Sequence, residues 1–330
     1  MKSQKNLVFI TVLLFFLSCI KEEKAKDFIL QGHVFGTTYK IVYLNASKNY
    51  QKSIDSLFFL MNKSLSTYIP TSDISKINKG DTTIVVDDLF LEVFKKSKKI
   101  HKETNGYFDP TVGNLVNAWG FGPQRGKKNL TQEALKAQMQ FVSLDKVTIL
   151  DRKVYKKYEE IYLDFNAIAK GFGIDIVGRF LERKKIKNYL IEVGGEIRAK
   201  GKKANNISWA IQLVDPIHKD GSKGFKKINL SDKSMATSGN YRKFRVAENG
   251  QKFVHTINPR TGFAKESNLL SASVIASLDC ADVDAYATAF MAMGFEKSKK
   301  FLEKHKNLDG ILLFVDENGR LKEYKTRDFK

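Results

Sequence analysis

Helix-type and strand-type segments follow one another irregularly along this chain, without the repeated strand–helix–strand order of a doubly wound protein. Residues 28–44 alternate polar side chains with β-formers and predict a strand pair. Residues 51–65 and 87–105 carry apolar side chains at helical spacing. No Pro- or Ser-rich linker divides the chain after this start. The sequence therefore predicts one α+β domain over residues 28–330, a single mixed domain of antiparallel sheet and helices.

The N-terminus has the composition of a targeting segment. The basic stretch MKSQKN precedes the apolar run LVFITVLLFFLSC, which is too short to cross a bilayer comfortably. Cys19 ends this run after a small residue and resembles the cysteine of a bacterial lipobox. The resemblance predicts a signal peptide over residues 1–18 and a lipidated tether over residues 19–27. The alternative is an ordinary signal peptide that contains a cysteine. With lipidation, we expect a bacterial cell-envelope protein that is anchored to a membrane by lipid and faces the periplasm.

The chain is strongly basic, with a formal net charge of +20. Its lysines are scattered along the whole sequence, whereas a nucleic-acid binder more often concentrates Arg and aromatic residues on one element. We therefore expect a solvated, lysine-rich surface and no nucleic-acid partner. Attraction to anionic lipid or to a phosphate-bearing ligand is the alternative.

Familiar cofactor motifs are absent or wrongly spaced. The glycines of GFGPQRG, residues 120–126, are one residue too far apart for the dinucleotide fingerprint, and GKK, residues 126–128, lacks the Ser or Thr of a Walker A motif. The sequence has no H-E-x-x-H, paired C-x-x-C or G-x-S-x-G motif, and its 5 His residues are widely spaced. A His-rich zinc site is therefore not predicted.

Three segments place polar side chains where a site could form. Asp164 ends a predicted strand, IYLDF, and Lys170 lies near a helix start, which suits a phosphate or, alternatively, a capping Asp with a surface Lys. Asp284 and Thr288 share one face of an apolar helix. They could bind Mg²⁺ through hard oxygens or serve as a cap and a back-bonded hydroxyl. His255 follows a strand and could act as a base or only fill a strand position.

The composition of two further segments also indicates local structure. Residues 106–123 are rich in Gly, Pro and aromatic side chains, too apolar for a linker and too irregular for an element, which is typical of a site-building loop. The stretch MATSGNY places Thr237, Ser238 and Asn240 in a predicted polar turn.

Taken together, eight segments resemble, in this order, the motifs of the ApbE-type FAD:protein FMN transferases. They are VFGTTY (34–39), LSTYIPTSDISKIN (65–78), GYFDPTVGNLVNAWGFGP (106–123), LDFNAIAKGFGID (163–175), VGGEI (193–197), ATSGNY (236–241), HTINPRTG (255–262) and DAYATAFMAMG (284–294). The resemblance extends over roughly residues 30–315. A string of ordered motifs is far more specific than any one of them.

The resemblance implies an ApbE-like fold and an enzyme that binds FAD and Mg²⁺. Such an enzyme breaks the FAD pyrophosphate, transfers FMN to a Thr or Ser hydroxyl of an acceptor protein and releases AMP. The implied acceptor is a subunit of a membrane redox complex or a small FMN-binding domain. An FAD pyrophosphatase that yields FMN and AMP, or an FAD-binding periplasmic lipoprotein, is the alternative.

The same resemblance assigns roles to individual residues. Asp284 and Thr288 would bind the metal ion through their side chains, and Ala167 through its backbone carbonyl. His255 would assist removal of the proton from the acceptor hydroxyl. FAD contacts are implied for Phe35, Tyr68, Tyr107, Phe108, Asp109, Asp164, Lys170 and Ile257. Many relatives have Glu where Lys170 stands, so this lysine could change how the flavin or the phosphate is held.

Overall fold

The computed structural model describes residues 25–123, 131–214, 224–239, 244–246, 252–254, 256–264 and 267–326. Cys19, Asn240 and His255 lie outside these ranges, and so does the predicted signal peptide. Within the described ranges, none of the helices combines the length and the apolar character needed to cross a bilayer.

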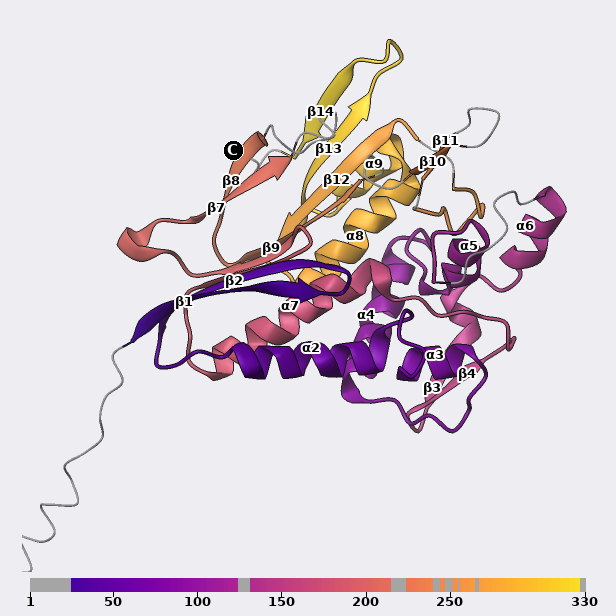
Figure 1. Cartoon of the computed structure of the whole chain (residues 1–330). Helices are drawn as coiled ribbons and strands as arrows, with labels where there is room; N and C mark the ends of the chain where they lie inside the picture. Colours follow the sequence, from indigo (N-terminus) through magenta and orange to yellow (C-terminus); the bar gives the residue numbers. More distant parts are fainter. Residues whose placement is uncertain are drawn as a thin grey trace, which may run out of the picture.

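One antiparallel sheet of eight strands organises the described part of the domain (Figure 1), in the order β1-β2-β5-β6-β9-β12-β13-β14. Each neighbouring pair runs antiparallel. The strands are β1 (Lys26–Val34), β2 (Thr37–Ala46), β5 (Tyr189–Val193), β6 (Glu196–Lys200), β9 (Lys233–Gly239), β12 (Leu269–Ala276), β13 (Asp309–Val315) and β14 (Leu321–Lys325). The predicted α+β class is confirmed.

The helices predicted at residues 51–65 and 87–105 are present. The helices are α2 (Gln51–Leu65), α3 (Asp73–Asn78), α4 (Asp88–Glu103), α5 (Gly113–Ala118), α6 (Gln132–Met139), α7 (Asn166–Arg183), α8 (Cys280–Met293) and α9 (Phe295–Lys304). Asp87 caps α4, because its carboxylate accepts a hydrogen bond from the N–H of Phe90. Short 3₁₀ helices span Pro110–Val112, Leu144–Lys146 and Ala204–Asn206.

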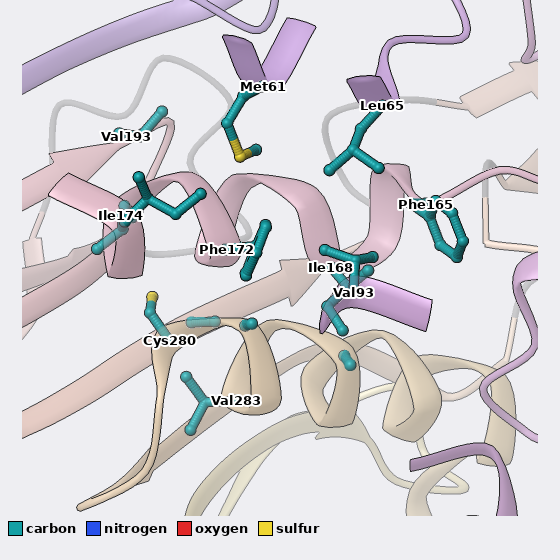
Figure 2. Packing of buried hydrophobic residues seen from close by; sticks show 14 of the residues in the cluster. Met61, Leu65, Val93, Phe165, Ile168, Phe172, Ile174, Val193, Cys280 and Val283 are labelled. Carbon is teal, nitrogen blue, oxygen red and sulfur yellow. The ribbon is translucent and has the colours of Figure 1, made fainter. Parts of the chain in front are cut away.

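Helices α7 and α8 pack against each other and against one face of the sheet (Figure 1), α7 over β5 and β6, and α8 over β9 and β12. Figure 2 shows the core that joins these layers, with Phe172 of α7 between Met61 of α2 and the start of α8. Phe172, Cys280 and Val283 are fully buried. Each such side chain contributes about 1.5–3 kcal/mol through burial, so the relative placement of α7 and α8 is strongly fixed.

Three small two-stranded sheets complete the described fold. They are β3 (Val147–Leu150) with β4 (Lys153–Lys156), β7 (Trp209–Val214) with β8 (Gly224–Leu230), and β10 (Phe244–Val246) with β11 (Lys252–Val254). The β7–β8 pair has its own apolar contacts with the large sheet, where Trp209 and Leu230 belong to one buried cluster with Met235 of β9.

Residues 106–123 were predicted to be too irregular for an element, but Gly113–Ala118 of this stretch form α5. Two further sequence-based predictions were wrong. Residues 161–165 form no strand, although Ile161, Leu163 and Phe165 are fully buried. The Asn78 side chain bonds to both the N–H and the carbonyl of Leu163, at 2.8 Å each. These β-formers therefore reflect burial and not strand pairing.

The predicted polar turn at Thr237 and Ser238 is also wrong, because both residues belong to β9. Thr237 is paired with Ser273 of β12, and their hydroxyls are 2.8 Å apart. A central strand can carry these hydroxyls because they bond to each other across the ladder.

Candidate active site

A cavity of about 1330 Å³ lies beside the first turns of α7 and the middle of α8 and extends to residues of β7. Pockets for drug-sized ligands typically measure about 300–1,000 Å³, so this one has room for a dinucleotide. Every predicted site residue that the structure describes lines it. These residues are Phe35, Tyr68, Tyr107, Phe108, Asp109, Asp164, Ala167, Lys170, Ile257, Asp284 and Thr288.

Helix α8 brings Asp284 and Thr288 to the cavity one turn apart. Asp284 is only 2% exposed, and burial raises the pKa of its carboxyl although the Lys170 charge opposes this. Its Oδ2 accepts a hydrogen bond from the backbone N–H of Gly171 at 3.1 Å. The Thr288 hydroxyl lies 3.2 Å from the hydroxyl of Ser238 on β9. Asp284 is therefore not a helix cap but a buried oxygen donor in the cavity wall.

The first turn of α7 faces the same spot. In an α-helix the N–H of residue i points at the carbonyl of residue i−4. Gly171 thus directs its N–H toward the Ala167 carbonyl, and the same N–H contacts Asp284. The backbone oxygen of Ala167 and Oδ2 of Asp284 thus both face the N–H of Gly171, although 117 positions separate the two residues in the sequence.

These donors suit a hard divalent cation. A carbonyl, a carboxylate and a hydroxyl are the oxygen ligands that Mg²⁺ takes, with substrate phosphates and waters completing its octahedron. No cluster of three or more His, Cys, Asp or Glu that could hold a metal ion occurs in the described part of the chain. The arrangement thus fits an ion that takes most of its ligands from backbone, hydroxyl and substrate, and does not fit a closed zinc site.

Lys170 adds a positive charge to the same wall. Its Nζ lies 3.2 Å from Oε1 of Glu196, at the start of β6. Burial lowers the pKa of Lys170, but the charges of Asp284 and Glu196 outweigh it and raise the pKa above its ordinary value. The lysine is therefore charged, and it lines the cavity near two carboxylates.

Glu196 is a cavity residue that sequence reasoning missed. It is 4% exposed, and its Oε2 has no hydrogen-bond partner among the residues that the structure describes. Burial raises its pKa to about 7, against the opposing charge of Lys170. Its place in the VGGEI motif was visible in the sequence, but nothing local indicated that this strand residue faces α7.

The β1–β2 turn contributes an aromatic ring. Phe35 and Gly36 form a two-residue hairpin loop, with φ of 53° and 74°. Such a turn requires positive φ at both positions, which is unfavourable for Phe. The ring of Phe35 packs edge-on against Phe58, with centroids 5.5 Å apart. The strained position holds this ring at the cavity, where it can contact a planar ligand.

Two residues of the loop at 107–110, Asp109 and Tyr107, make different kinds of contact within the protein. Both oxygens of Asp109 are used within the protein, by the N–H groups of Thr111 (2.8 Å) and Leu144 (3.1 Å). Asp109 therefore holds the loop in shape. Tyr107 lies under the cations of Arg260 and Lys297, which are 5.5 and 5.0 Å from its ring centroid.

Asp164 lines the cavity and forms no ion pair with another described residue. It is 8% exposed, and burial raises its pKa to about 6 although the N–H of Asn166 donates to it at 2.8 Å. Partial burial raises the pKa of the Tyr68 phenol, and the nearby charge of Asp164 raises it further. A buried carboxylate of this kind can accept a hydrogen bond from a ligand.

His255 lies outside the described residues, so its predicted role stays a prediction. The chain beyond it is described from Thr256, and both Thr256 and Ile257 line the cavity.

Fold and site together define a class of protein: an α+β domain with a dinucleotide-sized cavity whose wall carries oxygen donors of the kind that a divalent cation takes. The family model of the ApbE family matches residues 35–312. The chain belongs to the ApbE family, as its ordered motifs predicted.

Relatives in this family are similar over nearly their whole length. The FAD:protein FMN transferase of Haemophilus influenzae is 34% identical over 328 residues, covering 95% of this chain and 93% of that protein. The FAD:protein FMN transferase of Vibrio cholerae is 34% identical over 332 residues, covering 98% and 97%. Among solved structures, flavin transferase ApbE from Vibrio cholerae has a TM-score of 0.81 at 32% identity, covering 92% of this chain and 98% of that chain. Flavinyl transferase ApbE from Pseudomonas stutzeri also has a TM-score of 0.81, at 26% identity, with coverage of 92% and 96%.

Proposed function

We propose that this chain is a Mg²⁺-dependent FAD:protein FMN transferase. The observation that carries the proposal is the meeting of Ala167, Lys170 and Asp284 on one wall of a dinucleotide-sized cavity. The relatives are named FAD:protein FMN transferases and match almost end to end, which supports the same transfer reaction here.

The metal ion would be held by the side chains of Asp284 and Thr288 and by the Ala167 carbonyl. When bound, a divalent cation neutralises charge on the pyrophosphate oxygens of FAD and on the departing phosphate. Lys170 supplies further positive charge at the same wall. Phe35, Tyr68 and Tyr107 provide aromatic surface for the flavin rings.

The transfer step needs a hydroxyl, a base and a leaving group. The acceptor Thr or Ser oxygen forms a bond to the FMN phosphorus, the bond to the bridging pyrophosphate oxygen breaks, and AMP leaves with that electron pair. The hydroxyl proton goes to His255 in this proposal, an assignment that rests on the motif HTINPRTG. A positioned base typically contributes about 10²–10⁴-fold to the rate.

The acceptor and the location are part of the proposal. We propose a protein acceptor in the cell envelope, a subunit of a membrane redox complex or a small FMN-binding domain, reached by an enzyme held on the membrane through lipidated Cys19. The support for the location is the lipobox-like N-terminus alone.

Incubation with FAD, Mg²⁺ and a candidate acceptor tests the function. We expect a covalently fluorescent acceptor in a denaturing gel and loss of that label with EDTA. Release of AMP and free FMN without a labelled acceptor would instead identify an FAD pyrophosphatase. Bound FAD without any AMP would identify an FAD-binding protein.

A further inference from the structure

Asp175, in the middle of α7, caps the N-terminus of α8. It is fully buried, its Oδ1 accepts from the N–H of Cys280 and its Oδ2 from the N–H of Ala281, at 2.8 Å each. The residue at the usual cap position of α8, Asp279, makes no capping hydrogen bond with its own helix in the described structure. Two of the N–H groups that a helix start leaves unpaired are thus satisfied by another helix.

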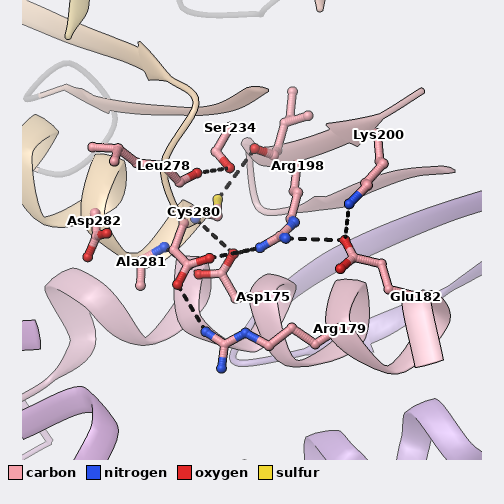
Figure 3. A network of polar contacts seen from close by, with 12 residues as sticks. Asp175, Arg179, Glu182, Arg198, Lys200, Ser234, Leu278, Cys280, Ala281 and Asp282 are labelled. Carbon is pink, nitrogen blue, oxygen red and sulfur yellow. Dashed lines mark hydrogen bonds and ion pairs between the residues drawn. The ribbon is translucent and has the colours of Figure 1, made fainter. Parts of the chain in front are cut away.

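Arg198 of β6 holds this capping carboxylate. Its Nη1 lies 2.6 Å from Asp175 and 3.0 Å from Asp279 (Figure 3). On its other side the same guanidinium contacts Glu182 at 3.3 Å. Asp279 also pairs with Arg179 at 3.0 Å. The planar fork of an arginine fixes the direction of such contacts, which a lysine cannot do.

A second link joins the same two helices in the opposite direction. One turn before Asp175, the N–H of Gly171 on α7 donates to Asp284 on α8, one turn after Cys280. A Cβ at Gly171 would lie 2.4 Å from the Cys280 carbonyl oxygen, so the helices approach as closely as backbones allow. We call these two links, Asp175 to the α8 N-terminus and Gly171 to Asp284, the helix clamp. Two links one turn apart fix both the rotation and the height of α8 against α7.

The clamp sets the distance between the two halves of the predicted metal site. Ala167 is on α7, whereas Asp284 and Thr288 are on α8. Mg²⁺ demands near-ideal octahedral geometry at about 2.0–2.1 Å, so a small sliding of one helix would spoil the ligand set. Asp175 therefore satisfies the N–H groups at the start of α8 and, in the same contacts, fixes the position of that helix against α7.

We propose that Asp175, held by Arg198, is a positioning residue that sets the metal-binding geometry of Asp284 and Ala167. This inference rests on the proposed Mg²⁺ dependence. Neither residue lines the cavity, so their effect on the metal ion passes through the placement of α8.

The test compares Asp175→Asn with Glu182→Gln in the purified protein. Asp175→Asn places an amide NH₂ against a helix N–H, whereas Glu182→Gln weakens an Arg198 contact that does not reach α8. Calorimetric titration with Mg²⁺ should give a dissociation constant about 10–100-fold higher for Asp175→Asn. Glu182→Gln should stay within about twofold of the wild type. The affinity for FAD without metal, measured by flavin fluorescence, should be unchanged in both variants. A general loosening of the fold would instead weaken the binding of both Mg²⁺ and FAD.

If Asp175→Asn does not fold, Arg198→Lys serves instead, because a single ammonium cannot bridge Asp175 and Asp279 in the same geometry. Its Mg²⁺ dissociation constant should rise several-fold. A folded Asp175→Asn or Arg198→Lys protein with wild-type Mg²⁺ affinity would overturn the positioning role and leave the proposed function standing. A wild-type protein that binds no Mg²⁺ would instead refute the metal-dependent function, and the positioning role with it.

Discussion

The backbone N–H of Gly171 on α7 donates a hydrogen bond to Oδ2 of Asp284 on α8 at 3.1 Å. Because the same N–H points at the Ala167 carbonyl within α7, the Ala167 carbonyl and the Asp284 carboxylate both face Gly171. This contact requires a glycine, because a Cβ would lie 2.4 Å from the Cys280 carbonyl oxygen. The predictions below depend on this junction of the two helices and on the charges around it.

Gly171→Ala should destabilise the protein. Gly→Ala within a helix normally gains up to about 1 kcal/mol, but here the methyl group must push α8 away, and overpacking costs about 1–3 kcal/mol. We expect a lower urea midpoint and weaker Mg²⁺ binding. A variant that is more stable than the wild type, with unchanged Mg²⁺ affinity, would show that the helices separate freely.

Asp284→Ala should lower AMP release by more than about 100-fold without unfolding the protein, because the site loses its carboxylate ligand. Burial raises the pKa of Asp284, so removing this buried charge offsets part of the stability lost with its hydrogen bond to Gly171. Steady-state kinetics measures the loss of AMP release, and thermal melting checks that the variant remains folded. Asp282→Asn is the matched control, since Asp282 is on the same helix but pairs with Lys96 at 3.1 Å. Equal activity losses in the two variants would contradict the assignment.

Lys170→Met should affect the two ligands in opposite directions. The ammonium lies near Asp284 and Glu196 and competes with a metal ion for their negative charge. Its loss should tighten Mg²⁺ binding several-fold and weaken FAD binding, because the pyrophosphate loses a cation. Separate titrations with Mg²⁺ and with FAD measure this. Weaker Mg²⁺ binding would mean that Lys170 supports the metal site instead.

Asp164→Asn should change how stability depends on pH. Burial raises the pKa of Asp164 from 3.8 to about 6 in the folded state. The folded state therefore binds a proton more readily than the unfolded chain, and this group costs stability as the pH rises from about 4 to about 6. The variant lacks this loss and should be more stable by up to about 3 kcal/mol at pH 8. Urea unfolding at pH 4, 6 and 8 measures the difference in free energy of unfolding between the variant and the wild type. A variant that is less stable than the wild type at pH 8 would contradict the prediction.

Residues that share one helix face could be predicted from the sequence. Asp284 and Thr288 are four positions apart, so their common face follows from helical periodicity alone. The ordered motifs then predicted which other segments meet at the site, and all the described residues among them line one cavity.

Long-range partners could not be predicted in this way. Asp175 caps a helix that begins 105 positions later, and Glu196 pairs with a lysine on another element. The error at residues 161–165 has the same origin, because buried β-formers look alike whether a strand or the side chain of Asn78 satisfies their backbone. Tertiary contacts decide these cases, and no local pattern records them.

The most direct test of the account is the stoichiometry of transfer. Purified protein, FAD, Mg²⁺ and an acceptor with a reactive Thr or Ser are incubated, and AMP and covalently bound flavin are quantified in the same sample. The account predicts one AMP released for each FMN attached to the acceptor, and neither product with Asp284→Ala. AMP that accumulates while the acceptor remains unlabelled would contradict transfer, and flavin attached without AMP would contradict the proposed bond cleavage.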